Sequence, residues 1–333
     1  MMEVRQASRA LSRVLVISLL FLLALNGCMG IGKVSLAETA ADVASSSVAQ
    51  APPKKFGIIY PMTYATYESI TQDAKATAES RNVTLLVNAP DEANTEQQIR
   101  IMEMMIKQKV DGIAISPVDT QALTPVIDKA QAAGIPVITF EWDAPDSNRV
   151  AYVGADNYAT GRQFAMTISD LLDNKGMIIV ETGMQEMIGL HQRLEGLLDY
   201  LNEESSIEVL DVRYNQGSED RAMSDIESMI DEHPHFSAMV SLDIVSAAVS
   251  TLIWKAKGLD RISLSMGNNP SSIETLQNGQ LTAVISQNEQ EWGRTIVETL
   301  LRVSDHRQVP EFMDMGIREI RQTDVQTVWA SAP

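Results

Sequence analysis

The sequence has few of the residues that usually carry covalent or metal chemistry. Its 333 residues include one cysteine and four histidines. A single cysteine excludes an intrachain disulfide, and the shortage of thiols and imidazoles argues against zinc or nucleophilic catalysis. The sequence also lacks a P-loop, a G-x-S-x-G elbow and a Cys-x-x-Cys pair. We therefore expect a protein without catalytic residues, metal or cofactor.

Positive charge is scarce as well, with 26 Lys and Arg residues against 44 Asp and Glu residues. Arg5, Arg9 and Arg13 precede an apolar run over residues 14–25, which is short for a membrane span but typical of a secretory signal. Without residues 1–27 the net charge is close to −20. This charge argues against nucleic acid as a partner, and the signal predicts export.

The lone cysteine, Cys28, follows Leu25, Asn26 and Gly27 at the end of the apolar run. The stretch resembles the lipobox of bacterial lipoproteins, in which the cysteine becomes the lipidated first residue, although Asn26 is unusual there. The alternative is an ordinary signal peptide with an incidental cysteine. We expect a signal peptide over residues 1–27, lipidation of Cys28 and a flexible Ala/Ser-rich tether over residues 28–53. This predicts a protein at the periplasm or the outer face of the cell envelope, anchored through Cys28.

Short apolar strands and amphipathic helices alternate from Lys54 onward. The helical stretches include residues 94–109, 120–134 and 218–233, with apolar side chains three and four apart. The strand candidates are KFGIIY, VTLLVN, VDGIAIS, IPVITF, RVAYVG, GMIIVE, IEVLDV, SAMVSL, ISLSMG and LTAVISQ. Because the strands are hydrophobic throughout, they predict doubly wound α/β sheets that are covered on both faces. The length after the tether favours two lobes.

Residues 134–145, GIPVITFEWDAP, begin as a buried strand and then reach Glu141, Trp142 and Asp143. In doubly wound sheets, ligands bind outside the carboxyl ends of the strands. A buried unpaired carboxylate would be costly, so we expect a ligand to supply hydrogen-bond donors to Glu141.

Seven segments in order resemble the sugar-binding proteins of ABC transporters that are related to the ribose-binding protein. They are KFGIIYPM, VDGIAISPVD, AGIPVITFEWDAPDS, AYVGADNYATG, RLEGL, LQNGQLTAVISQNEQEWG and VPEFMDMG. The resemblance runs from about residue 54 to residue 327. LacI-type repressors share this core, but they carry an N-terminal helix-turn-helix where this chain has an export signal.

The resemblance implies a type I periplasmic binding protein fold, with two Rossmann-like lobes of parallel sheet joined by three crossover strands. The order of the segments places the crossings near residues 154–157, 286–288 and 314–316. The expected N-terminal lobe comprises residues 54–155 plus 288–315. The expected C-terminal lobe comprises residues 156–287 plus 316–330.

The resemblance also implies contacts from the first lobe. Its tyrosine loop offers Tyr60, Tyr64 and Tyr67, of which at least one is expected to stack on the sugar, although Tyr67 can instead open the first helix and merely pack. Glu141 takes the place of a carboxylate that accepts hydrogen bonds from two hydroxyls. Trp142 stands where relatives have arginine or serine, and Asp143 is a ligand contact or a loop cap.

In the second lobe the resemblance points to His191, Asp243, Asn268 and Gln287 as ligand contacts. Arg193 is interpreted as a structural partner, and His191 as the only plausible positive group in the cleft. Relatives read Asn-Asp at Leu242 and Asp243, and a Gly-Phe-Asp turn at Gly267, Asn268 and Asn269. The departures argue against ribose, because several of its hydroxyls would lose their partners. We expect a small neutral or cationic carbohydrate-like ligand.

The sequence allows two roles for the receptor and contains one candidate metal site. As a transport receptor, the protein is expected to be a monomer that delivers its ligand to an ABC permease in the membrane. The alternative is a sensory receptor, for example for autoinducer-2 or an amino-sugar, coupled to a membrane histidine kinase or chemoreceptor. His233 and His235 have a ligand-like spacing, but they follow an acidic helix end, where a histidine usually interacts with the helix dipole.

Overall fold

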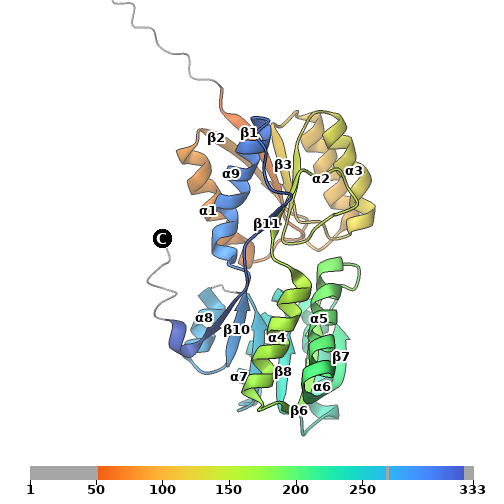
Figure 1. Ribbon diagram of the computed structural model, residues 1–333, viewed down its shortest axis with the longest axis vertical. Coiled ribbons are helices and arrows are strands. Elements are labelled where there is room, and N and C mark those ends of the chain that lie inside the picture. The colour runs from red at the N-terminus through yellow and green to blue at the C-terminus, as the bar shows by residue number, and fades with distance from the viewer. Residues whose placement is uncertain (1–51, 268–269, 326–333) are drawn as a thin grey trace, which may run out of the picture. The chain divides into compact units, whose positions relative to one another are not determined.

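The computed structural model describes residues 52–267 and 270–325, so Cys28, Asn268 and Asn269 lie outside the described residues. The described chain contains two six-stranded sheets, which Figure 1 shows with helices packed on both. Each of the ten strand candidates overlaps an observed strand, and two short strands, β11 and β12, were not among them. The predicted fold class is confirmed.

The first sheet has the order β11-β5-β4-β3-β1-β2, and all its strands are parallel. Its strands are β1 (Lys54–Ile59), β2 (Val83–Asn88), β3 (Gly112–Ile115), β4 (Val137–Phe140), β5 (Ala151–Gly154) and β11 (Phe312–Asp314). The helices that pack on it are α1 (Thr66–Ser80), α2 (Thr95–Lys107), α3 (Thr120–Ala132) and α9 (Trp292–Ser304). Buried clusters lie on both faces, one under α1 and α9 and one under α2 and α3.

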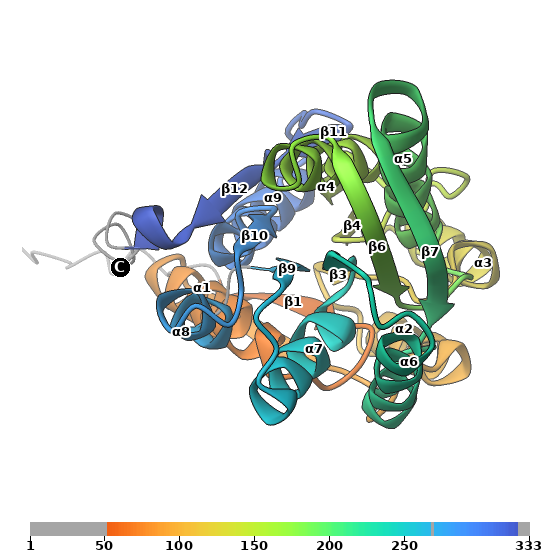
Figure 2. The same cartoon turned by 90° about the horizontal axis from the view of Figure 1, so that it is seen from below.

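The second sheet has the order β12-β10-β9-β8-β6-β7, and β12 is antiparallel to β10. Its strands are β6 (Lys175–Thr182), β7 (Ser206–Tyr214), β8 (Ala238–Ser241), β9 (Ile262–Met266), β10 (Ala283–Ser286) and β12 (Arg318–Arg321). Its helices are α4 (Asn157–Leu171), α5 (Ile188–Glu204), α6 (Glu219–Glu232), α7 (Ile244–Lys257) and α8 (Pro270–Gln277). Figure 2 shows α4 and α5 on one face of this sheet and α6 and α7 on the other.

Three helices in the predicted stretches begin at a polar N-cap residue. Asn94, Asp119 and Ser218 each accept a hydrogen bond from a backbone N–H two or three residues into helices α2, α3 and α6. The helices then turn their apolar residues toward the sheets, which removes that surface from water.

The chain passes between the two sheets three times. The passages are from β5 to α4, from β10 to α9, and from β11 to β12. A short 3-10 helix, η1 (Glu289–Glu291), lies in the second passage, and another, η2 (Gln322–Asp324), follows β12. Because the strands of each lobe come from separate parts of the sequence, residues far apart in the chain meet where the lobes face each other.

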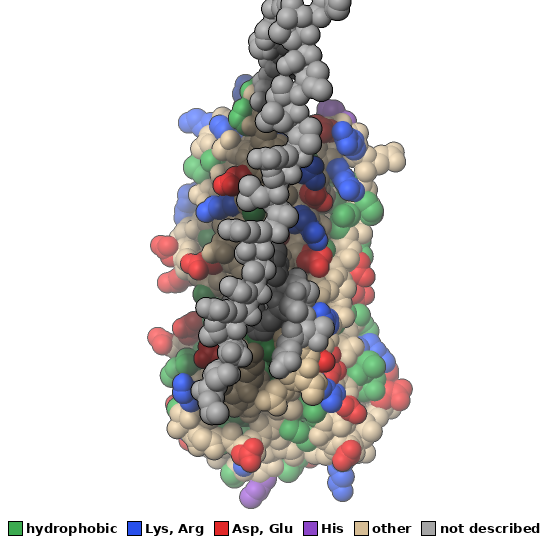
Figure 3. All heavy atoms as spheres, turned by 90° about the vertical axis from the view of Figure 1, so that its left-hand side faces the viewer, with side chains coloured by type: hydrophobic (Ala, Val, Ile, Leu, Met, Phe, Trp, Pro, Cys, Tyr) green, Lys and Arg blue, Asp and Glu red, His purple; other side chains and the backbone are tan. Residues whose placement is uncertain are grey.

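Charged residues are interspersed among other residues on one face of the molecule. Figure 3 shows red and blue side chains scattered among apolar ones on the part of one face that grey atoms do not cover. Among the described residues, no helix has the length and apolar content needed to cross a membrane.

Candidate ligand-binding site

A pocket lies at the carboxyl ends of strands from both sheets. Its cavity volume is about 50 Å³. The first lobe contributes Tyr67 from α1 and Glu141 after β4, and the second contributes Met184 after β6 and Asp243 after β8. Gln287, directly after β10, reaches the pocket from a passage between the sheets. This is the position that doubly wound sheets favour for a ligand.

Glu141 is 6% exposed and has a left-handed backbone with φ of 62°. Its N–H donates to the Val153 carbonyl at 3.0 Å, which helps hold this uncommon conformation. The Tyr67 hydroxyl donates to its carboxylate at 2.9 Å, and the Ser116 hydroxyl donates to the same oxygen at 2.9 Å. The protein itself therefore supplies two donors to this carboxylate, and further donors from a ligand remain a prediction. Burial still outweighs these bonds and raises the Glu141 pKa to about 7.

The three tyrosines of the first-lobe loop have different surroundings. Tyr67 lines the pocket, and its ring stacks on Tyr60 at a centroid distance of 4.6 Å and an interplanar angle of 26°. Tyr60 and Tyr64 are not among the residues that line this pocket. Tyr64 instead packs against the buried cluster under α6 and α7, which does not support its predicted ligand contact.

Trp142 reaches from the first lobe to α5 of the second. It is 6% exposed, and the Arg193 guanidinium carbon lies 5.2 Å from the centroid of its ring, which is a cation–π distance. A Cβ atom added to Gly189 would lie only 2.5 Å from the Trp142 ring, so the glycine makes room for the indole. Trp142 thus fills space between the lobes.

Arg193, and not His191, supplies the positive charge of the pocket. His191 is exposed and does not line the pocket, whereas Leu190 and Arg193 do, so the predicted helical register was wrong. Arg193 donates through Nη1 to the Leu242 carbonyl at 2.5 Å and through Nη2 to Asn157 Oδ1 at 2.6 Å. Burial lowers its pKa to about 10, while nearby carboxylates act in the opposite direction. It remains charged at neutral pH.

Asp243 lines the pocket and is also the N-cap of α7. Its carboxylate accepts hydrogen bonds from the backbone of Val245 and Ser246, from the Ser246 hydroxyl, and from Asn215 Nδ2 at 3.1 Å. Burial nevertheless raises the Asp243 pKa. The four donors indicate that this carboxylate organises the second lobe whether or not it meets a ligand.

Gln287 is fully buried and lines the pocket. Its Nε2 donates to Asn157 Oδ1 at 3.1 Å and to Thr160 Oγ1 at 2.9 Å, while its Oε1 has no hydrogen-bond partner among the described residues. Glu289, which the sequence analysis missed, lines the pocket beside it and accepts from Ser286 Oγ at 2.6 Å.

Asp143 has the structural role that was one of its two predicted alternatives. It accepts hydrogen bonds from the Thr139 hydroxyl at 2.8 Å, the Ala144 N–H at 2.7 Å and Arg149 Nη2 at 2.8 Å. It does not line the pocket between the lobes. Asn268 cannot be placed because it lies outside the described residues.

Four methionines that the sequence patterns did not single out also line the pocket. Met62 follows β1, Met184 follows β6, Met187 precedes α5 and Met266 ends β9. All four occur at or just beyond the carboxyl ends of predicted strands, and that position is the signal that could have identified them.

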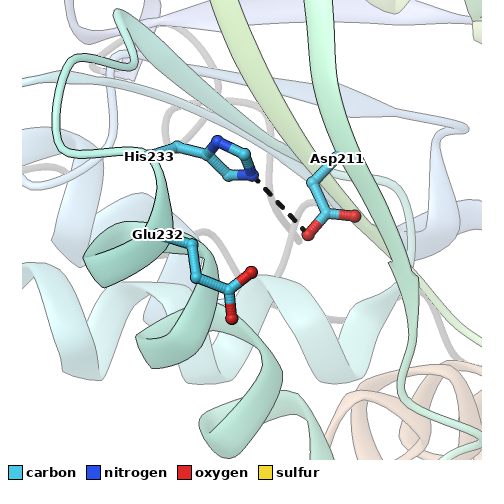
Figure 4. Close-up of side chains that lie close together, drawn as sticks. All are labelled: Asp211, Glu232 and His233. Carbon is cyan, nitrogen blue, oxygen red and sulfur yellow. Dashed lines mark ion pairs between the residues drawn. The ribbon is translucent and has the colours of Figure 1, made fainter.

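A cluster of possible metal ligands lies away from the pocket. Figure 4 shows His233 pointing toward Asp211, with Nε2 and Oδ2 3.9 Å apart, and Glu232 beside them. Arg213 already pairs with both carboxylates, through Nε to Asp211 and Nη2 to Glu232, each at 2.8 Å. The guanidinium thus supplies the positive charge that these carboxylates need.

The chain that forms this pocket also matches the model of a protein family. The model of the periplasmic binding protein domain matches residues 56–308, most of the chain. The chain belongs to the periplasmic binding protein family. This is a family of solute-binding proteins, and its type I members have the two-lobed architecture described above.

Curated relatives and solved structures of this family resemble the chain at low identity. The ribose import binding protein of Bacillus subtilis is 20% identical over 70% of this chain and 75% of its own length. The D-ribose/D-allose-binding protein of Pseudomonas aeruginosa is 25% identical over 72% of this chain and 76% of its own. A Burkholderia graminis solute-binding protein, solved with D-arabinose, has a TM-score of 0.78 and 22% identity, covering 82% of this chain and 97% of its own.

Proposed function

We propose that this protein is an extracytoplasmic receptor that binds a small sugar or sugar-like polyol between its lobes and delivers it to an ABC permease. The observation that carries the proposal is the buried Glu141, held by Tyr67 and Ser116 at the edge of a pocket that both lobes line. The names of the curated relatives, which refer to ribose, allose and xylose, support a sugar.

The lobe boundaries of the proposal are residues 54–155 plus 288–315 and residues 156–287 plus 316–330. The three passages between the sheets support a hinge there. In the proposed mechanism the ligand binds both walls and stabilises the closed arrangement, which the permease then recognises. The receptor acts as a monomer and carries out no catalysis.

The proposed ligand is neutral or cationic. Glu141, Asp243 and Glu289 bring three carboxyl groups to the pocket lining, against the single guanidinium of Arg193 among the described lining residues. A ligand carboxylate would meet this excess of acidic groups, whereas hydroxyl or ammonium groups can donate to it.

The proposal includes a lipid anchor at Cys28, supported by the lipobox-like stretch of the sequence. Cys28→Ser should release the protein from the membrane fraction and leave its ligand affinity unchanged. Wild-type protein that is already fully soluble in the cell envelope would contradict the anchor.

Thermal-shift screening of purified residues 54–333 against sugars, polyols and amino-sugars tests the binding function. A ligand that binds only the folded state should raise the melting temperature in a concentration-dependent way. Small-angle scattering with a saturating hit should then give a smaller radius of gyration. Conversion of the ligand to a product would contradict the receptor function, and unchanged scattering would contradict closure.

A sensory receptor is the second candidate. A structure described as the XylFII–LytSN complex has a TM-score of 0.76 with this chain and 20% identity, so a protein of this fold is known in a complex with another protein. The neighbouring genes distinguish the two roles: permease and ATPase genes support transport, and a histidine kinase gene supports sensing.

A further inference from the structure

The polar side chains of the pocket already have most of their hydrogen-bond partners within the protein. Tyr67 and Ser116 donate to Glu141, four donors surround Asp243, and Arg193 donates to Asn157 and the Leu242 carbonyl. Among the buried side-chain polar atoms of the described lining residues, two have no partner. These are Arg193 Nε, which is a donor, and Gln287 Oε1, which is an acceptor.

The remaining wall of the second lobe is apolar. Met184, Met187, Leu190 and Met266 line it, and Met187, Leu190 and Met266 are 7%, 4% and 4% exposed. Thioether and alkyl groups offer no strong hydrogen bond to a sugar hydroxyl, but their flexible chains fit well against carbon. Met187 and Leu190 also belong to the same buried cluster as Trp142 of the first lobe. A ligand that enters there replaces apolar contacts.

We infer that the ligand is amphipathic: a sugar-like molecule with hydroxyls on the side of Glu141 and Gln287 and a deoxygenated or alkylated side against the methionines. A fully hydroxylated hexose would bury hydroxyls against Met184, Met187 and Met266 without partners. Replacing such a hydroxyl by hydrogen, or capping it with a methyl group, removes that cost and adds apolar contact. The inference rests on the proposed function and specifies its ligand class.

Matched sugar pairs test this selectivity directly. Titration calorimetry would compare L-fucose with L-galactose, L-rhamnose with L-mannose, and methyl β-D-ribofuranoside with D-ribose. In at least one pair, the deoxy or methylated member should bind tenfold or more tightly than its hydroxylated parent. If the parents bind equally or more tightly, the ligand class is wrong while the receptor function stands. If no member of the three pairs and no sugar or polyol of the thermal screen binds, both fail.

Variants of the methionine wall locate the effect. Met184→Gln places an amide in the wall at a half-buried position, so the fold should tolerate it, and the preference for the deoxy or methylated member should fall by fivefold or more. Met187→Gln tests the same wall at a buried position, with its melting temperature measured alongside. Met223→Gln is the matched control, because Met223 is 39% exposed on α6 and does not line the pocket. An unchanged preference in Met184→Gln and in folded Met187→Gln would overturn the assignment of the apolar side.

Discussion

The two walls of the pocket differ in how their carboxylates are held. On the first-lobe wall, Glu141 is held by the hydroxyls of Tyr67 and Ser116, and its carboxylate still faces the space that a ligand would occupy. On the second-lobe wall, Asp243 is saturated by donors of its own lobe, and Met184, Met187 and Met266 lie among the lining residues. If the pocket binds a ligand as proposed, the first lobe would orient it through hydrogen bonds, and the second would select it by shape and apolar contact.

Arg193 is the residue that most directly connects the two walls, and its removal should have the largest effect. Arg193→Met would take two donors from Asn157 and the Leu242 carbonyl and would end the contact with Trp142. Removing one member of a buried charged network typically costs 3–5 kcal/mol, so we expect the free energy of unfolding to fall by about that amount in urea titrations. Arg100→Met is the control, because its side chain is 66% exposed, and it should change stability by less than about 0.5 kcal/mol. Equal effects of the two variants would mean that the Arg193 network adds no stability.

Glu141 tests the polar wall. Glu141→Gln keeps the size of the side chain but loses the charge-assisted hydrogen bonds, so ligand affinity should weaken by about 1.5–3 kcal/mol, roughly ten- to a hundredfold, in calorimetry. The Glu141 pKa of about 7 adds a pH dependence. Since the carboxylate is the better acceptor, the affinity of a neutral ligand should rise as pH increases through 7 in the wild type and stay flatter in the variant. Unchanged affinity with an intact circular dichroism spectrum would show that the first-lobe wall does not anchor the ligand.

Trp142 is predicted to anchor the ligand together with Glu141, and in the structure it also contacts the second lobe. Because its indole already packs near Arg193 and against Gly189, it helps hold the lobes together as well as walling the pocket. A Trp142→Ala variant would therefore combine lost ligand contact with a changed closure equilibrium, so its affinity has to be interpreted together with small-angle scattering.

A second buried glutamate provides the contrast to Glu141. Glu181 in β6 is fully buried, and neither carboxylate oxygen has a hydrogen-bond partner among the described residues. Burial and the nearby charges of Asp243 and Asp225 raise its pKa from 4.5 to about 9. The folded protein thus holds a proton that the unfolded chain releases above pH 4.5, so stability falls as pH rises from about 4.5 to about 9.

Glu181→Gln should remove this pH-dependent cost. We expect the free energy of unfolding to increase by about 1–2 kcal/mol at pH 7.5, less than the full linkage effect because the buried amide also lacks partners. The gain should shrink toward pH 5. Glu208→Gln on the neighbouring strand β7 is the control, since Glu208 is exposed. A gain that is absent, or equal at both pH values, would contradict the raised pKa.

The fold could be predicted because continuous apolar runs in the sequence mark most of its strands. Nearly continuous runs of Val, Ile and Ala, each bounded by Gly, Pro or polar residues, identified ten strands and their parallel arrangement. β11 and β12 were missed because they are three and four residues long and mostly polar or half-buried, so no apolar run marks them. They form through pairing with β5 and β10, which is a tertiary effect.

The site was less predictable, and the errors have physical causes. Glu141 was identified because a charged residue directly after a buried strand stands out. His191 was misplaced because one residue on a helix corresponds to about 100° of rotation, and a small error in register exchanges an exposed for a buried face. The donors of Glu141, Tyr67 and Ser116, are 74 and 25 residues away in the chain, so sequence spacing gave no sign that the carboxylate would be paired.

Tyr152 gives the finest test of the polar wall, because its hydroxyl acts on the backbone of Glu141. The ring of Tyr152 lies in β5 and stacks on Phe312, and its hydroxyl donates to the carbonyl of Glu141 at 2.9 Å, with the Ala155 carbonyl at 3.1 Å. This bond and the Glu141 N–H bond together fix a residue whose positive φ is unfavourable for a side chain with a Cβ atom.

Tyr152→Phe should therefore keep the stacked ring and release the carbonyl of Glu141. We expect the free energy of unfolding to fall by about 0.5–1.5 kcal/mol, the usual net value of one hydrogen bond, and ligand affinity to weaken a few-fold because Glu141 is less well oriented. Tyr158→Phe is the matched control, since it also loses one hydroxyl bond, to Asp199 at 2.9 Å, but that bond joins α4 to α5 away from the pocket. If both variants lose stability and neither loses affinity, Tyr152 supports the fold alone, and the Glu141 side chain holds its orientation through Tyr67 and Ser116 without help from its backbone.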